Sequence, residues 1–282
     1  MDNNFTKKPI VVFYHADCLD GFGAAWATWR KFGDTAEYFP VFHDGKTSHV
    51  SGKEVYMVDI VFEKEILDRL KSENKRVTVI DHHISVKEAA LSTENPLFDI
   101  NHSGCVLAWK YFFPKKPVPK LLLAIEDIDI WKHKVRGSWS LYQYLDMEDF
   151  DFNKWSKFVA DFENPKKRKL MLEKGDFIAE FQKRVAEKNI DHNARLVKFE
   201  GYTVYAINAA NFTNTTGEIL RTKKPPFAIM WREKKDGSVA VSLRGVGDID
   251  CSQIAMKYGG GGHKLSAAFK LKSINDIPWK PA

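Results

Sequence analysis

Acidic and imidazole side chains directly follow a short apolar run in the first half of the sequence. Residues 77–80 are mostly β-branched, and all but Thr78 are apolar, which predicts a buried strand of a parallel sheet. Asp81, His82 and His83 come next. Burying titratable groups costs free energy unless they are paired or bind an ion. Because carboxylate and neutral imidazole are good metal ligands, this pattern indicates a site for a divalent metal.

Two other apolar runs end in the same way. Residues 11–14 are followed by an imidazole and two carboxylates, those of His15, Asp17 and Asp20. Asp59 follows residues 55–58. In an open parallel sheet, ligands bind outside the carboxyl ends of the strands. These side chains are therefore expected to meet in one crevice.

A fourth apolar run, residues 121–125, is interpreted as another strand that ends on acids. Glu126, Asp127 and Asp129 follow it. Either aspartate could instead cap a helix, and only one of them need be a ligand. Packing alone explains such a set of polar strand ends poorly, which favours a functional site.

The order of the remaining elements predicts an α/β protein with a second domain. Strands and helices alternate over residues 11–130, with an edge strand at 37–42, a helix at 62–72 and a helix capped by Ser103. Such alternation is typical of βαβ units and a mainly parallel sheet. We predict a parallel-sheet domain over residues 1–150, a helical linker over 151–192, and a smaller mixed α/β domain over 193–282.

The second domain contains a glycine cluster, residues 259–262, followed by His263. Glycine allows backbone N–H groups to approach an anion closely, so the cluster is interpreted as a phosphate-binding segment and not as a strand interior. A flexible loop is the alternative. Residues 265–269 are expected to be helical, and residues 232–237 to connect a hairpin through an Asp-Gly turn. Arg244 is assigned to an anion, with a surface salt bridge as the alternative.

Composition sets the class of protein. The chain has 282 residues, of which 44% are hydrophobic and 28% charged, as in ordinary globular proteins. The apolar stretches are too short to span a bilayer, and the first ten residues show no secretory signal. Three widely spaced cysteines favour a reducing cytoplasm over a disulfide framework. The net charge of +6 favours anionic partners, and the basic cluster at residues 165–169 fits a solvated helix start or a nucleic-acid patch equally well.

Three of these motifs together resemble those of the DHH phosphoesterase superfamily. They are the Asp81-His82-His83 triplet, residues 15–21, and the glycine cluster with His263. The C-terminal part resembles the DHH-associated domain of RecJ-type and nanoRNase-type members. The resemblance implies an N-terminal domain that holds two Mn²⁺-type ions, a helical linker, and a C-terminal domain that closes over the substrate phosphate.

The resemblance also implies roles for single residues. Asp59 would bridge the two ions, His82 would be a ligand, and His83 would lie beside the scissile phosphate. The acid of the fourth motif falls on Asp127. The predicted metal ligands are His15, Asp17, Asp20, Asp59, His82 and Asp127.

The first motif departs from the family pattern. The family often has D-x-D-G, whereas this chain has Cys18, Leu19, Asp20 and Gly21. Either Asp17 or Cys18 could supply the missing ligand. Because carboxylate suits Mn²⁺ better than thiolate does, Asp17 is predicted.

The predicted function is a two-metal phosphodiesterase acting on short oligonucleotides or on linear or cyclic dinucleotides. Asp59 and His83 form the catalytic set, and the ions are predicted to be Mn²⁺, with Mg²⁺ or Fe²⁺ as alternatives. The predicted substrate-binding residues are Arg244, Gly260, Gly261, Gly262 and His263. A single-strand exonuclease, a pyrophosphatase or polyphosphatase, and a non-catalytic nucleotide sensor are alternatives. No membrane partner is expected, and the sequence leaves a homodimer open.

Overall fold

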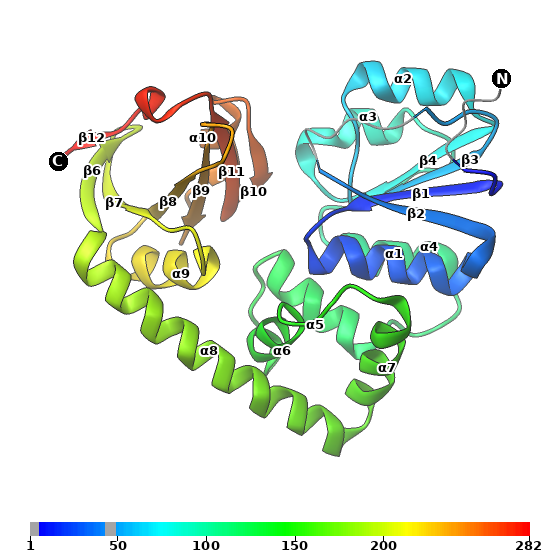
Figure 1. Ribbon diagram of the computed structural model, residues 1–282, viewed down its shortest axis with the longest axis horizontal. Coiled ribbons are helices and arrows are strands. Elements are labelled where there is room, and N and C mark those ends of the chain that lie inside the picture. The colour runs from blue at the N-terminus through cyan, green and yellow to red at the C-terminus, as the bar shows by residue number, and fades with distance from the viewer. Residues whose placement is uncertain (1–5, 43–48) are drawn as a thin grey trace. The chain divides into compact units, whose positions relative to one another are not determined.

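The computed structural model describes residues 6–42 and 49–282, and the chain divides into two compact units, Met1–Asp176 and Phe177–Ala282 (Figure 1). The division falls within α8 (Pro165–Asn193), and the segment expected to be a helical linker contains α7 (Phe152–Glu163) and most of α8. Within the described ranges, no helix is both long and apolar enough to cross a membrane.

The first unit is built on a parallel sheet with the strand order β2-β1-β3-β4-β5, in which each neighbouring pair is parallel. The strands are β1 (Ile10–His15), β2 (Ala36–Val41), β3 (Glu54–Val58), β4 (Arg76–Asp81) and β5 (Leu97–Phe98). The predicted α/β class is confirmed. Pro40, which has no N–H group to donate to a neighbouring strand, lies on the edge strand β2, where proline is tolerated.

Helices cover both faces of this sheet (Figure 1). One face carries α1 (Leu19–Phe32) and α4 (Gly104–Phe112), and the other carries α2 (Lys64–Glu73) and α3 (Lys87–Leu91). Val12 and Tyr14 of β1 belong to the core formed with α1 and α4. Val11 and Phe13 belong to the core formed with α2. Because both faces are buried, the strands appear in the sequence as continuous apolar runs.

Residues 121–125 are helical, so the prediction of a fourth metal-bearing strand there was wrong. They belong to α5 (Lys120–Asp129), in which Leu121 and Ile125 are buried and Leu123 is 40% exposed. This spacing has the period of a helix, which a short apolar run conceals. The unit also contains α6 (Ser138–Leu145) and the 3₁₀ helices η1 (Gly33–Thr35) and η2 (Ile84–Val86).

The second unit contains a mixed sheet in the order β10-β11-β9-β8-β7-β6-β12. Its strands are β6 (Arg195–Phe199), β7 (Tyr202–Asn208), β8 (Phe227–Glu233), β9 (Val239–Gly245), β10 (Gly261–His263), β11 (Ser266–Leu271) and β12 (Lys280–Pro281). Its other helices are α9 (Thr213–Lys223), α10 (Cys251–Met256) and the 3₁₀ helix η3 (Ile274–Asp276). β7 and β8, which α9 connects in the chain, are parallel neighbours, whereas the other neighbouring strands are antiparallel. The predicted mixed α/β domain and its β8–β9 hairpin are confirmed.

The glycine cluster and the residues after it form strands, which corrects two predictions. Gly261 and Gly262 pair with β11, and the segment predicted to be helical lies largely in β11. In β11 buried and exposed side chains alternate, as in a strand. A Cβ added at Gly260 would lie 2.1 Å from the carbonyl oxygen of Ala268. The close approach of two backbones therefore requires glycine here.

Candidate metal centre

The ends of three adjacent strands bring the candidate ligands together. His15 is the last residue of β1, Asp59 follows β3, and Asp81 ends β4 immediately before His82. The strand order reverses between β1 and β3, because the chain passes from β1 to β2 on one side and on to β3 on the other. Ligands of open α/β sheets bind outside the carboxyl ends at this point of reversal. The sheet thus places the polar residues where such proteins bind their ligands.

Asp59 is the centre of the cluster. It is 1% exposed, and its carboxylate lies 3.1 Å from His82 Nε2, 3.5 Å from His15 Nδ1 and 3.8 Å from His83 Nδ1. Burial raises the pKa of Asp59, but hydrogen bonds with His15 and His82 outweigh it and hold the pKa well below its usual value. The backbone of Asp59 has a φ of 59°, in the left-handed region that costs free energy for a non-glycine residue. Such strain is typical of functional positions.

Asp20 joins the cluster from the first turn of α1. Its carboxylate accepts hydrogen bonds from the N–H groups of Gly104 at 2.6 Å and Cys105 at 3.0 Å, at the start of α4. The predicted start of this helix is confirmed, but Ser103 makes no side-chain cap and Asp20 takes that role. Asp20 Oδ2 also lies 3.6 Å from His82 Nε2. Burial, followed by the charge of Asp59, raises the pKa of Asp20.

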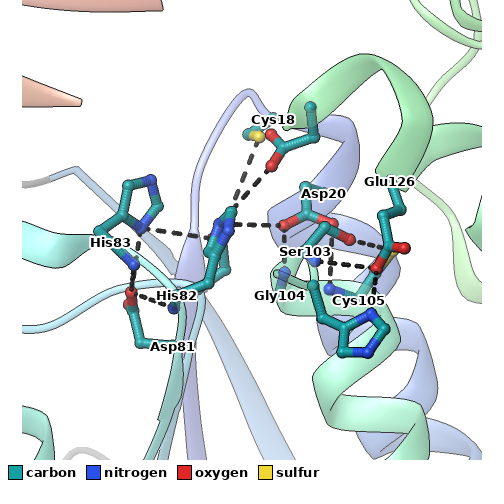
Figure 2. A network of polar contacts seen from close by, with 12 residues as sticks. Cys18, Asp20, Asp81, His82, His83, Ser103, Gly104, Cys105 and Glu126 are labelled. Atoms are coloured by element: carbon teal, nitrogen blue, oxygen red, sulfur yellow. Dashed lines mark hydrogen bonds and ion pairs between the residues drawn. The ribbon is translucent and has the colours of Figure 1, made fainter. Parts of the chain in front are cut away.

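Cys18, and not Asp17, faces the cluster. Asp17 is exposed and has a φ of 50°, which turns the chain before α1. Cys18 Sγ lies 4.0 Å from Asp59 Oδ2. Figure 2 shows Cys18, Asp20 and His82 gathered around the same point. The structure thus places the thiol of Cys18, and not the carboxylate of Asp17, beside Asp59, and burial followed by the charge of Asp59 raises the pKa of Cys18.

Asp129, and not Asp127, reaches the cluster from α5. Asp129 Oδ2 lies 3.6 Å from His82 Nε2, and burial followed by the charge of Asp20 raises its pKa to about 8. Asp127 instead accepts hydrogen bonds from the Lys134 N–H at 2.7 Å and the Ser138 hydroxyl at 2.6 Å. Residues two apart on a helix point about 200° apart, so only one of these aspartates can face the sheet. This helical phase is the signal that could have selected Asp129 from the sequence.

Asp81 positions the two histidines. Its Oδ1 accepts the N–H groups of His82 at 2.6 Å and His83 at 2.7 Å, and it lies 3.0 Å from His83 Nδ1 (Figure 2). Burial lowers the pKa of His82, but the hydrogen bond with Asp59 and the surrounding carboxylates raise it to about 10. The DHH triplet therefore contributes two imidazoles that face the cluster and a carboxylate that orients them.

Two sets of donor atoms share the Asp59 carboxylate. His15, Cys18 and Asp59 form one set, and Asp20, Asp59 and His82 form the other. Within each set the ligand atoms lie within 4.8 Å of one another. Imidazole, carboxylate and thiolate are all ligands of divalent transition metals, and a carboxylate has an oxygen for each of two ions. The donor sets therefore fit a pair of divalent ions.

An aromatic and basic loop follows Asp129 in the chain. Trp131 and His133 have φ values of 55° and 49°, and their ring centroids lie 4.9 Å apart. The backbone carbonyl of Asp127 accepts the N–H groups of Lys132 at 2.9 Å and His133 at 3.1 Å. With its carboxylate bonded to Lys134 and Ser138, Asp127 therefore organises this loop. This loop was not among the predicted site residues, although its aromatic and basic side chains are visible in the sequence.

In the second unit, the structure places Arg244 and His263 in one row of the sheet. Ser266 of β11 is in register with Arg244 of β9 and also with His263 of β10. The Arg244 guanidinium donates to Asn214 Oδ1 from Nη2 at 2.6 Å and from Nε at 3.1 Å. We call Arg244, Ser266 and His263 the Arg244 row. That Arg244, His263 and the glycines bind substrate stays a prediction.

Comparison with known proteins gives a family match in this second unit. The DHHA1 domain model matches residues 200–278. The chain is 29% identical over 297 residues to R106, an uncharacterised protein of Acanthamoeba polyphaga mimivirus, which covers 96% of this chain and 69% of that protein. The family match falls on the part of the chain that was expected to be the DHH-associated domain.

Two solved structures are similar to this chain over most of its length. PggH from Vibrio cholerae, a pGpG-specific phosphodiesterase, has 12% identity and a TM-score of 0.49, covering 95% of each chain. RecJ from Thermus thermophilus, solved with Mn²⁺, has 12% identity and a TM-score of 0.48, covering 93% of this chain and 49% of that one.

Proposed function

We propose that the chain, whose residues 200–278 match the DHHA1 domain model, is a DHH-superfamily metal-dependent phosphodiesterase of short oligonucleotides or dinucleotides. The observation that carries the proposal is the buried Asp59 carboxylate, which is shared by two sets of metal-ligating atoms at the ends of β1, β3 and β4. A cluster of this kind has no role in packing, and removing its charges from water is costly unless cations are bound.

The ions would be held by imidazole and carboxylate groups of the first unit. The proposed ligands are His15, Asp20, Asp59, His82 and Asp129. Mn²⁺ fits a carboxylate-rich set, with Mg²⁺ and Fe²⁺ as alternatives. Divalent ions bound there would lower the pKa of a water molecule and neutralise charge on the phosphoryl oxygens.

His83 is proposed to act on the substrate itself. Its Nδ1 is held by Asp81, which fixes the orientation of the ring. Burial lowers the pKa of His83, but the charge of Asp81 and its hydrogen bond to the ring outweigh burial and raise the pKa. An imidazolium in a buried site can donate a hydrogen bond to a phosphoryl oxygen, where negative charge grows in the transition state. His83 is therefore assigned to transition-state stabilisation, while Asp81 is a positioning residue.

The loop after Asp129 supports a nucleotide substrate over pyrophosphate or polyphosphate. Trp131 and His133 provide ring faces, and Lys134 is an exposed cation beside them. Lys132 instead pairs with Glu126 at 3.2 Å. Aromatic side chains stack on nucleobases with a contribution of about 1–3 kcal/mol per base, and every base has such a face. An inorganic polyphosphate has no group that would use these rings.

The compartment and the size of the substrate are part of the same proposal. Cys18, Cys105 and Cys251 are free, which suits a reducing cytoplasm. The net charge of +6 is modest, and long single strands need many phosphate contacts for tight binding. We therefore propose substrates of a few nucleotides.

A substrate panel tests this proposal. Chelated protein would be reloaded with Mn²⁺, Mg²⁺, Fe²⁺ or Co²⁺ and incubated with dinucleotides, cyclic dinucleotides, short and long single strands, pyrophosphate and polyphosphate. We expect metal-dependent cleavage of dinucleotides and short oligomers. Cleavage of polyphosphate alone would instead support the polyphosphatase alternative, and nucleotide binding without any cleavage would support the sensor.

The loop provides a second test of the nucleotide assignment. Trp131→Ala should raise the KM for a dinucleotide about tenfold, because one stacking contact is lost. Trp131→Phe keeps a ring face and should retain most of the affinity. If both variants had the wild-type KM, the rings would not contact a base.

A further inference from the structure

The two donor sets that share Asp59 differ in chemistry. His15, Cys18 and Asp59 offer nitrogen, sulfur and oxygen, whereas Asp20, Asp59 and His82 offer oxygen and nitrogen. Asp129 adds another carboxylate to the second set, 3.6 Å from His82 Nε2. We name them the thiol set and the carboxylate set. A pair of equivalent ions would be expected to have equivalent ligands, and these sets are not equivalent.

The placement of Cys18 differs from that of the other two cysteines. Cys105 and Cys251 are fully buried members of the apolar cores of their units. Cys18 belongs to neither core, and its Sγ lies beside the Asp59 carboxylate. It is the N-cap residue of α1, where burial raises the pKa of its thiol and the Gly21 N–H lowers it in part, and the thiol points at the Asp59 carboxylate. Packing in an apolar core therefore does not account for the position of this sulfur.

We propose that Cys18 is a thiolate ligand at one of the two metal positions, so that the centre holds two different ions. The thiol set would bind a thiophilic ion such as Zn²⁺, Co²⁺ or Fe²⁺, because sulfur is a soft donor. The carboxylate set would bind a harder ion such as Mn²⁺ or Mg²⁺. The proposal rests on the metal centre of the proposed function, but its test does not require hydrolysis.

Exposed Asp17 provides the competing assignment. A carboxylate from this position would make both sets oxygen-rich and would suit two Mn²⁺ ions. In the structure, however, the Asp17 side chain is exposed, whereas the Cys18 sulfur lies within 4.8 Å of the ligand atoms of His15 and Asp59. The geometry thus favours the Cys18 sulfur as the ligand over the Asp17 carboxylate, which would suit Mn²⁺ better.

Cobalt spectroscopy on the metal-free protein tests the proposal directly. Thiolate bound to Co²⁺ gives a charge-transfer band in the near ultraviolet, which imidazole and carboxylate ligands do not give. We expect wild-type protein to bind two Co²⁺ ions and to show this band. Cys18→Ser should lose it, whereas Asp17→Ala and Cys105→Ser should keep it. Cys18→Asp should bind two ions without the band and should favour Mn²⁺ over Zn²⁺ more than wild type does.

The outcomes separate this inference from the proposed function. Two bound Co²⁺ ions without a charge-transfer band would overturn the thiolate ligand and leave the two-metal centre standing. No bound ion would overturn both. A band that persists in Cys18→Ser and disappears in Asp17→Ala or Cys105→Ser would also overturn the assignment.

A measurement on wild-type protein covers the case in which Cys18→Ser fails to fold. Alkylation of each cysteine would be followed by mass spectrometry with and without Zn²⁺. Zn²⁺ should protect Cys18 from alkylation and leave the reactivity of Cys105 and Cys251 unchanged. Equal alkylation of Cys18 with and without bound Zn²⁺ would contradict the proposal.

Discussion

In the first unit, Asp20, Asp59 and His82 are each at most 2% exposed, whereas Arg244 and His263 of the second unit are half-buried. The first set lies at the carboxyl ends of parallel strands, where it has carboxylates in excess and is removed from water. The Arg244 row lies on antiparallel strands and carries positive charge. Burial of like charges favours a bound cation, while a half-exposed guanidinium suits an anion that binds reversibly. This difference is the basis for proposing metal binding in the first unit and phosphate binding in the second.

Removing the shared carboxylate should give the largest effect. Asp59→Asn should lower phosphodiesterase activity by about three orders of magnitude, because a neutral amide cannot balance two cations and metal catalysis contributes several kcal/mol. The turnover of a dinucleotide under saturating metal measures this loss. Asp17→Asn is a matched control, since Asp17 also has a left-handed backbone but is exposed, and asparagine tolerates that conformation. Equal activity of the two variants would show that Asp59 is only a turn residue.

Metal binding should stabilise the first unit. An ion present at about 100 times its Kd adds about 2.7 kcal/mol to the free energy of unfolding. For a domain of this size, we expect the Tm to rise by about 5–10 °C. Thermal unfolding with and without Mn²⁺ measures the shift, and Asp59→Asn should abolish it. A Tm that Mn²⁺ raises equally in Asp59→Asn would place the ion elsewhere.

The pH dependence of stability should report the same cluster. The pKa values of Asp129 and His82 are raised to about 8 and about 10, for the causes given above. Both groups therefore bind more protons in the folded than in the unfolded state between their ordinary and raised pKa values. The metal-free protein should lose stability as the pH rises from about 6 to about 9. Mn²⁺ should offset this loss, because it binds the deprotonated ligands.

Chemical denaturation at each pH measures this trend. His82→Asn removes one of the two titrating groups and should flatten it. Metal-free protein that gains stability over the same pH interval would contradict the burial of uncompensated acids in the first unit.

Changes in the Arg244 row should have a smaller effect than changes at Asp59. Arg244→Ala should raise the substrate KM by about tenfold to a hundredfold and lower kcat to a lesser extent, because a hydrogen bond to a charged phosphate is lost. Arg244→Lys should recover part of the affinity, since it keeps the charge but not the fork. Arg232→Ala is a matched control on the neighbouring strand β8. A wild-type KM in Arg244→Ala would remove the phosphate-binding role from this row.

The basic cluster near the start of α8 should have the smallest effect. Lys167 pairs with Asp161 at 2.6 Å, and Lys169 lies 3.6 Å from Glu173, so these charges already have acidic partners. Replacing both lysines by alanine should change dinucleotide cleavage less than about twofold, because exposed ion pairs contribute little. Cleavage of short substrates should depend weakly on salt. A steep salt dependence that the double variant removes would indicate tracking along long strands.

The fold and most of the centre could be predicted because buried parallel strands are continuous apolar runs. The ends of β1, β3 and β4 are visible as the points where such runs meet His15, Asp59 and Asp81. In open parallel sheets, the carboxyl ends of neighbouring strands lie side by side where ligands bind, so these residues meet there.

Other choices depended on local geometry that composition does not reveal. The phase of α5 decides between Asp127 and Asp129, and the left-handed turn at Asp17 decides which side chain near it faces inward. The strand after the glycine cluster forms because it pairs with distant segments of the chain. Gly260 is needed there because the backbone of Ala268 approaches it closely. Local propensity favoured a helix there, and tertiary pairing overrode it.

The number of ions bound per chain tests the central claim most directly, namely that Asp59 is shared by two metal positions. Co²⁺ accepts nitrogen, oxygen and sulfur ligands, so it can fill both donor sets. Equilibrium dialysis followed by elemental analysis should give two Co²⁺ ions per chain in wild type and in Asp17→Asn, and fewer than one in Asp59→Asn. A single ion in wild type, or two ions retained by Asp59→Asn, would contradict the shared centre.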